Sequence, residues 1–267
     1  MAEFAAKESV TGTKTKEEYN LYCHYVAGLV GIGLSKLFAA SELEDASVGE
    51  ELARANSMGL FLQKTNIIRD YLEDLEEGRT WYPEEVWSKH VGQLSDMADK
   101  ANQEKALGCL NELVTDALQH IPDVFAYMSS LQNQSVFNFC AIPQVMAIAT
   151  LATVYDNPAV FKGVVKIRKG TAVQLMMRAT SMDQLYSIFD EHTFIIKNKM
   201  RSKEVSLKAT KQILCKVDDL MEVARDAGVF TSDRTEAVPV AWIRTPLVVG
   251  LVGYAVYASG TFHQLLL

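Results

Sequence analysis

The chain has 267 residues, of which 49% are hydrophobic and 22% are charged, and its formal net charge is −7. This composition is typical of a globular protein with a substantial core, and it excludes a disordered chain. The negative charge argues against nucleic acid as a partner, because a domain that binds nucleic acid usually carries a basic surface.

Cysteine and histidine spacing restricts the kind of metal site. The four cysteines form no CxxC pair, the five histidines show no zinc-binding spacing, and Met1 to Lys16 lacks the apolar core of a secretory signal. We therefore expect reduced cysteines and a cytosolic main domain. A bound metal is expected to be a hard ion such as Mg²⁺ on carboxylates.

Apolar residues recur at three- and four-residue spacing along most of the chain, which predicts an all-α fold. The second predicted helix should end at Gly78, because glycine readily adopts the left-handed conformation. Pro83 and the two glutamates after it predict another helix start. Helices are predicted at 16–40, 50–76, 101–120, 122–131, 135–155, 158–177, 182–200 and 203–227.

The C-terminal end is predicted to leave the helical domain, which we assign to residues 1–225. Residues 226–245 are polar and read as a linker. Residues 246–267 carry no charged side chain, and a helix of that length spans a hydrocarbon core of about 30 Å. We expect a membrane anchor there, with Arg244 favouring a cytosolic main domain. A buried final helix is the alternative, because glycine, histidine and glutamine make the segment only moderately apolar.

A second apolar run, Val136 to Val154, is also long enough to be considered as a membrane span. It contains Asn138, Pro143 and Gln144, and polar groups are costly to bury in hydrocarbon. We interpret this run as a core helix whose polar residues line a cavity.

An acidic cluster lies near the end of the second predicted helix. Asn66, Asp70 and Asp74 fall at i, i+4 and i+8, so a helix would place them on one face with Glu73 beside them. Mg²⁺ prefers oxygen ligands and typically bridges carboxylates to substrate phosphates, so this pattern suits a Mg²⁺–diphosphate site. A solvated acidic helix end is the alternative, since most charge runs are no more than that.

Two further groups of residues have more than one interpretation. Lys162, Lys166, Arg168 and Lys169 could recognise phosphate or form an ordinary solvated face. Three glycines within the first predicted helix indicate either close approach of another helix or contact with an apolar ligand, and close packing is the preferred interpretation. These glycines are Gly28, Gly31 and Gly33.

Several stretches resemble the squalene and phytoene synthase family. One runs Tyr22-Cys-His-Tyr-Val-Ala-Gly-Leu-Val-Gly, and the other runs from Gln63 to Asp74 through the acidic cluster. Residues 133–151 are similar to the animal, squalene-forming members of the family, and the resemblance covers about residues 22–177. Trp81 departs from the pattern, which usually has Phe or Tyr there.

The resemblance implies an isoprenoid-synthase-type helical bundle. It implies head-to-head coupling of two farnesyl diphosphates through presqualene diphosphate, which NADPH then reduces to squalene. Asp70 and Asp74 would hold Mg²⁺, and Asn66 and Glu73 would complete or orient its shell. Metal ions held by carboxylates neutralise the charge that develops on a leaving diphosphate. The implied location is the endoplasmic reticulum membrane, with the catalytic domain facing the cytosol.

Roles for other residues also follow from the resemblance. Tyr22 would be the essential tyrosine of the first half-reaction and Phe139 the aromatic residue of the second, because carbocations need aromatic faces and exclusion of water. Core packing is the alternative for both. Arg69, Lys166 and Arg168 would contact NADPH, although Arg69 could instead bind phosphate or pair with a neighbouring carboxylate.

The resemblance further implies a first Asp-x-x-Glu-Asp motif upstream of Tyr22. Only 21 residues precede Tyr22, and they contain no such motif. We therefore expect a fragment, a truncated isoform or an incomplete gene model. Two function classes stay open: a squalene-forming enzyme polypeptide, and a catalytically inactive, membrane-tethered remnant that binds isoprenoid diphosphate or a partner helix. Phytoene-type coupling without reduction is a weaker third.

Overall fold

The computed structural model describes residues 12–231, which all fall within one compact unit, Met1–Ser232. Every regular element among these residues is helical, so the all-α prediction is confirmed. The predicted membrane anchor at 246–267 and most of the predicted linker lie outside the described residues.

The first predicted helix, at 16–40, is confirmed as one continuous rod. It consists of α2 (Lys16–Cys23), a π-helical turn η1 (His24–Gly28) and α3 (Leu29–Ala40). Thr15 caps its start by accepting a hydrogen bond from the Glu18 backbone N–H. A π-helical turn re-aims the residues that follow it, and such turns are frequent at functional sites.

The rod packs closely against α4 (Leu52–Arg69), as its glycines predict. A Cβ atom on Gly28 would lie 2.0 Å from the Asn56 side-chain oxygen, and one on Gly31 would lie 2.4 Å from the Ala55 carbonyl oxygen. A Cβ atom on Gly33 would have no neighbour within 4 Å, so the close-packing prediction is wrong for that residue.

The predicted helix at 50–76 is interrupted at Asp70, which separates α4 from α5 (Tyr71–Glu76). The backbone of Asp70 leaves helical values, with φ −91° and ψ 18°. The Tyr82 hydroxyl donates a 2.8 Å hydrogen bond to the Ile68 carbonyl in the last turn of α4, which helps to satisfy the interrupted ladder. Gly78, at φ +75°, ends α5 as predicted.

Short elements follow before the chain enters the core. Pro83 is the N-cap of α6 (Glu84–Trp87), which confirms the helix start predicted there. Two short turns come next, η3 (Leu94–Ala98) and η4 (Lys100–Asn102). A third short turn, η2 (Ala46–Gly49), lies earlier in the chain, between α3 and α4.

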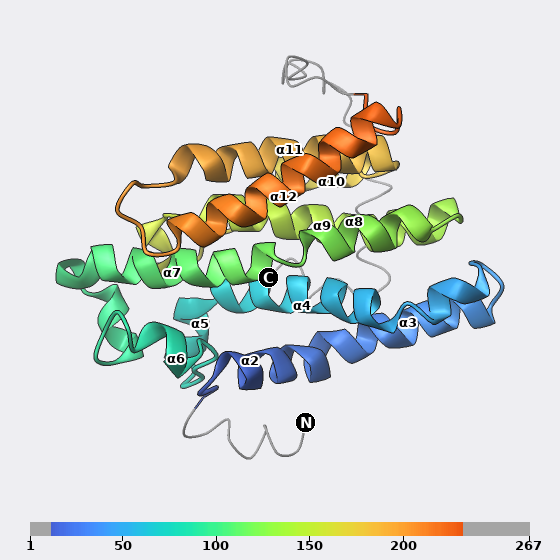
Figure 1. Cartoon of the computed structure of the whole chain (residues 1–267). Helices are drawn as coiled ribbons and strands as arrows, with labels where there is room; N and C mark the ends of the chain where they lie inside the picture. The colour runs from blue at the N-terminus through green and yellow to red at the C-terminus, as the bar shows by residue number, and fades with distance from the viewer. Residues whose placement is uncertain (1–11, 232–267) are drawn as a thin grey trace. The chain divides into compact units, whose positions relative to one another are not determined.

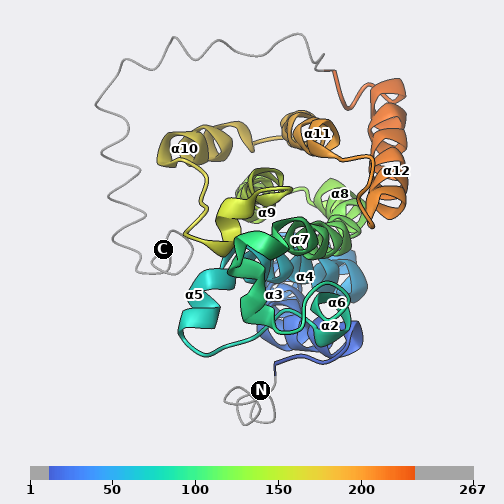
Figure 2. The same ribbon diagram turned by 90° about the vertical axis from the view of Figure 1, so that its left-hand side faces the viewer.

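Two further layers complete the described bundle, and both views show them (Figures 1 and 2). The elements before α7 form the first layer. The middle layer lies between this first layer and the outer layer. The middle layer comprises α7 (Gln103–Leu118), α8 (Ile121–Ser130) and α9 (Gln134–Val154). The outer layer comprises α10 (Lys169–Arg178), α11 (Met182–Lys199) and α12 (Leu207–Asp226).

The prediction of one helix over 158–177 is wrong. The chain instead forms a short 3₁₀ turn, η5 (Pro158–Phe161), and residues 162–168 carry no helix before α10 begins. Gly163, Val164 and Val165 explain the break, because glycine and β-branched residues have low helix propensity.

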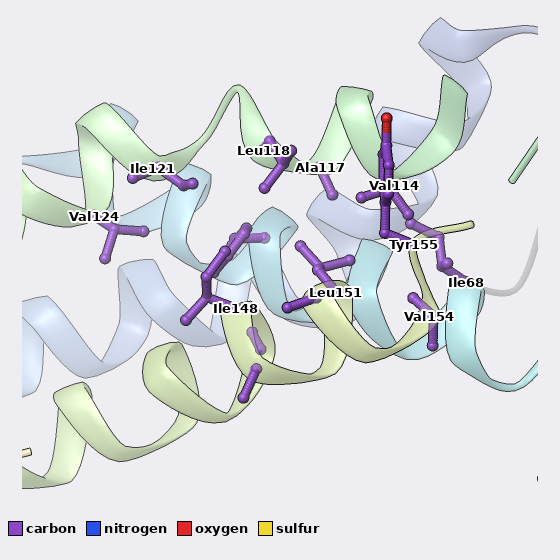
Figure 3. Close-up of a cluster of buried hydrophobic side chains, with 14 of the residues drawn as sticks. Ile68, Val114, Ala117, Leu118, Ile121, Val124, Ile148, Leu151, Val154 and Tyr155 are labelled. Carbon is purple, nitrogen blue, oxygen red and sulfur yellow. The ribbon is translucent and has the colours of Figure 1, made fainter. Parts of the chain in front are cut away.

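The main core lies where α4, α7, α8 and α9 meet (Figure 3). Five of its side chains are fully buried and pack together there: Ile68, Leu118, Ile121, Ile148 and Leu151. Among the described residues, two helices are long and apolar enough to cross a membrane, by length and composition only: 16–40 and α9. The apolar stretch of α9 is 67% buried in the fold, which confirms it as a core helix.

Candidate functional site

The acidic cluster lies at the break between α4 and α5, where two arginines already hold its aspartates. Arg69 donates from Nε and Nη2 to the two Asp70 carboxylate oxygens, both at 2.6 Å. Arg79, placed by the Gly78 turn, donates from Nη2 and Nε to Asp74 Oδ1 at 2.8 and 3.0 Å. Both aspartates are therefore fixed by charge-assisted hydrogen bonds.

The electrostatics of the cluster favour an added positive charge. Burial and then the charge of Asp70 raise the pKa of Glu73, while Lys166 opposes this rise. Burial also raises the pKa of Asp74, even though the hydrogen bonds from Arg79 oppose it. A cation beside these carboxylates would stabilise their ionised forms.

Lys166 reaches this cluster from the irregular segment before α10. Its Nζ lies 3.9 Å from Glu73 Oε1, which brings a predicted cofactor residue to the predicted metal residues. Arg168 is the exposed N-cap residue of α10, and no described contact joins it to the carboxylates. Its predicted contact with NADPH is not tested by these contacts and stays a prediction.

The residues predicted to bind Mg²⁺ fit that ion in donor chemistry. Asn66 lies one turn before Asp70, and all the candidate donors are oxygens, the ligand type that Mg²⁺ prefers. Across residues 12–231, however, no three His, Cys, Asp or Glu side chains are gathered closely enough to hold a metal ion. The metal assignment therefore stays a prediction.

Tyr22 lies on α2, buried against Trp81. The two rings stack with centroids 4.0 Å apart and an interplanar angle of 14°. The departure from the family pattern at Trp81 therefore lies directly on the predicted catalytic tyrosine and not at a remote position.

Phe139 lies on α9 at the edge of an apolar cavity of about 210 Å³ between α3, α4, α8 and α9. Its ring is 56% exposed and packs edge-on against Phe38 of α3, with centroids 6.2 Å apart. The neighbouring Phe137 is buried, so packing accounts for that residue. Phe139 instead presents an accessible aromatic face beside a cavity.

The cavity and the acidic cluster lie along the same helix. Ala55, Gly59 and Leu62 of α4 line the cavity, and Asn66 and Asp70 continue the same three- to four-residue spacing. The distance from Gly59 to Asp70 along the helix is about 16 Å at 1.5 Å per residue. The arrangement suits an elongated apolar molecule with an anionic group at one end.

Gln144 of α9 lines the cavity, as the sequence predicts for the polar residues of that helix. Two residues that shape this region were not predicted. Arg79 could have been found, because the predicted Gly78 turn folds the chain back toward α5. Tyr127 lines the cavity only through the packing of α8, so no local pattern predicts its placement.

Comparison with known proteins decides the family. The sequence profile described as squalene/phytoene synthase matches residues 1–171. The chain belongs to the squalene/phytoene synthase family. Its all-helical fold agrees with a solved structure of TcSQS with the ligand BPH1237, at a TM-score of 0.77 and 40% identity, over 80% of this chain and 63% of that one.

Curated relatives in the family include the squalene synthases of mammals and plants. The mouse protein is 58% identical over 217 residues, covering 81% of this chain and 51% of the relative. The human protein is 59% identical over 214 residues, covering 80% and 50%. The Nicotiana benthamiana protein is 46% identical over 238 residues, covering 88% and 56%. The chain thus spans about half the length of these relatives.

Proposed function

We propose that this chain forms part of the active site of a squalene synthase. That part consists of the acidic cluster at Asp70, Glu73 and Asp74 and of the apolar cavity. The reaction would join two farnesyl diphosphates through presqualene diphosphate and then reduce the product with NADPH. The observation that carries this proposal is the placement of Asp70, Glu73 and Asp74 at the break between α4 and α5, just after the turns of α4 that line the cavity.

The residues present have distinct tasks in this proposal. Asp70 and Asp74, supported by Glu73 and Asn66, would hold Mg²⁺, which neutralises the diphosphate as it leaves the allylic carbon. Arg79 lies against Asp74 and adds a fixed positive charge beside the leaving diphosphate. The carboxylates thus position the charged end of the substrate.

The apolar end of the substrate would lie in the cavity, which excludes water from a reactive carbocation. Phe139 offers its ring to positive charge there. Tyr22, stacked on Trp81, is held in a single orientation for the first half-reaction.

NADPH would be contacted by Arg69, Lys166 and Arg168. Lys166 supports this assignment, since it already approaches the acidic cluster. Because no other basic residue of the 162–169 segment is joined to the cluster by a described contact, Lys166 is the first of the three to test. We further propose an endoplasmic reticulum location through the segment 246–267, with the helical domain in the cytosol.

A catalytically inactive, membrane-tethered remnant is the second candidate. The rod at 16–40 carries exposed apolar side chains that the described residues leave uncovered: Leu21, Leu29, Val30 and Leu37 are 43–60% exposed. Contiguous exposed apolar side chains often mark a surface for another chain.

Product analysis separates the candidates. The purified chain is incubated with farnesyl diphosphate, Mg²⁺ and NADPH, and the products are identified by mass spectrometry. The proposal predicts squalene, and presqualene diphosphate when NADPH is omitted. Binding of farnesyl diphosphate without any coupled product would favour the remnant, and a coupled product with another carbon skeleton would contradict both.

A further inference from the structure

The apolar cavity contains one buried polar side chain whose function the packing does not explain. Gln144 of α9 lines the cavity and is only 2% exposed. Its Oε1 atom is buried and has no hydrogen-bond partner among the described residues. A buried amide oxygen left in this state is unfavourable for the folded chain alone, so each such group calls for an explanation.

Two other polar groups of the cavity wall, the hydroxyls of Ser35 and Tyr127, already have hydrogen-bond partners. Ser35 donates its hydroxyl hydrogen to the Gly31 carbonyl at 3.0 Å, so the 2.5 Å bond between Tyr127 and Ser35 uses the hydrogen of Tyr127. Burial raises the pKa of the Cys140 thiol to about 12, which keeps that group neutral at physiological pH. Among the described side chains that line the cavity, Gln144 therefore has a buried acceptor atom, Oε1, without a hydrogen-bond partner.

The charge of Glu44 acts on Tyr127 and Cys140 in the cavity wall, but its carboxylate is already hydrogen-bonded elsewhere. Glu44 is 6% exposed, and its two oxygens accept hydrogen bonds from the backbone N–H groups of Gln132 and Asn133 at 2.8 and 2.9 Å. It is not among the residues that line the cavity. Among the described residues, the lining of the cavity therefore offers dipoles and aromatic rings and contains no carboxylate.

A backbone carbonyl of α9 near Gln144 also lacks its helical hydrogen-bond donor. Pro143 lies inside α9 and has no N–H, so the carbonyl of Phe139, four residues earlier, lacks its usual helical donor. Phe139, Pro143 and Gln144 all line the cavity.

We propose that Gln144 is a specificity-determining residue that favours a positively charged isoprenoid chain over a neutral one in the cavity. The inference rests on the proposed function, because ionisation of an allylic diphosphate leaves that positive charge on the chain. The amide oxygen of Gln144 lies against the cationic carbon and stabilises it, while the diphosphate leaves toward the acidic cluster.

Two unreactive probes test this preference. The first is farnesyl thiolodiphosphate, which is neutral along its chain, and the second is an aza analogue in which a protonated tertiary amine replaces the branched allylic carbon. Calorimetric titration with Mg²⁺ gives both affinities. We expect the wild-type chain to bind the aza analogue about tenfold more tightly, a ratio of the size that one favourable polar contact supplies.

Matched variants assign the preference to Gln144. Gln144→Met keeps the side-chain length and removes the amide, and we expect the ratio to fall toward 1 with little change for the neutral probe. Gln144→Glu should raise the ratio. Leu34→Met, an apolar exchange in the same cavity wall, should leave it unchanged. Far-ultraviolet circular dichroism checks that each variant is folded.

Three results would contradict this role of Gln144 or the function on which it rests. An unchanged ratio in Gln144→Met would overturn the inference and would indicate that the amide oxygen only binds an ordered water. If Gln144→Met does not fold, an unchanged ratio in Gln144→Glu overturns it instead. Failure of the wild-type chain to bind either probe would contradict the proposed function itself, and the inference with it.

Discussion

At the residue scale, the two aspartates of the acidic cluster are held by arginines but remain partly accessible. The side chains of Asp70 and Asp74 are 24% and 14% exposed. They can therefore bind a cation from the open side without repacking the core. Replacing either carboxylate should therefore reduce product formation more than it reduces the stability of the fold.

We predict that Asp70→Asn or Asp74→Asn abolishes squalene formation in a protein competent for the reaction, while the helical signal in circular dichroism is retained. The physical reason is that an amide cannot supply the negative charge that holds Mg²⁺. Glu76→Gln is the matched control, since Glu76 is an exposed acid on the same short helix. Near-normal product formation in either aspartate variant would refute the assignment.

Two glycines of α3 give opposite predictions for the same substitution. Gly31→Ala would place a methyl group 2.4 Å from the Ala55 carbonyl, so we expect the free energy of unfolding to fall by roughly 1–3 kcal/mol. Gly33→Ala meets no atom within 4 Å and should raise it by about 0.5–1 kcal/mol through higher helix propensity. Urea unfolding measures both, and equal effects would contradict the close packing of α3 on α4.

Residue-scale prediction from the sequence succeeded where spacing alone decides the outcome. The i, i+4 spacing placed Asp70 and Asp74 near one another, and the left-handed glycine at 78 was foreseen from its position. Partner choice was not predictable in the same way. The stacking of Trp81 on Tyr22 joins residues 59 positions apart in sequence, and it depends on how the loop after α5 returns to α2.

At the element scale, a buried ion pair joins α4 to α7. Lys64 is fully buried, and its Nζ lies 2.6 Å from Asp116 Oδ2. We predict that Lys64→Met lowers the free energy of unfolding by about 3–5 kcal/mol, because it leaves a buried carboxylate unpaired. The double variant Lys64→Met/Asp116→Leu should recover most of this loss. Additive single-variant losses in a double-mutant cycle would contradict coupling between the two helices.

Another charged group fixes α7 to the N-terminal layer and makes stability depend on pH. Burial raises the pKa of Glu112, but hydrogen bonds from His90 and Lys89 outweigh it and lower the pKa from 4.5 to about 2. Lys16 of α2 also approaches Glu112, at 3.4 Å. The stabilisation is therefore fully present above pH 4.5 and is lost as pH falls toward 2.

We predict that Glu112→Gln removes roughly 1–3 kcal/mol of stability at pH 7, because solvent screening of this partly buried group reduces the value of 1.36 kcal/mol for each pKa unit. It should also flatten the acid dependence of unfolding between pH 4.5 and 2. Chemical denaturation at several pH values measures both effects. Glu222→Gln, at an exposed position of α12, is the control. An unchanged pH slope in Glu112→Gln would contradict the proposed origin of the acid sensitivity.

Element boundaries were predictable where a cap or a long apolar period marks them. The rod at 16–40 and the core helix α9 follow their hydrophobic patterns. The break at Asp70 was not predictable, because its helical spacing continues on both sides and only a tertiary hydrogen bond from Tyr82 takes up the Ile68 carbonyl. The break after Phe161 carried a local signal, glycine with β-branched valines, that the helical period obscured.

At the scale of the whole molecule, the described bundle joins a charged end and an apolar cavity along α4. The cavity arises only when α3, α4, α8 and α9 pack together, so the sequence indicated a cavity wall in α9 without its other sides. The chain spans about half the length of its mammalian squalene synthase relatives, at 58–59% identity. Substrate binding by this chain therefore tests the account more directly than turnover does.

The decisive measurement is calorimetric binding of farnesyl thiolodiphosphate to the purified chain, with Mg²⁺ and again with EDTA. The comparison includes the double variant Asp70→Asn/Asp74→Asn. The account predicts binding to the wild-type chain that requires Mg²⁺ and that is lost in the double variant, whose fold is retained. Equal affinity in EDTA, or full affinity in the double variant, would contradict the claim that this acidic cluster binds a diphosphate through a metal ion.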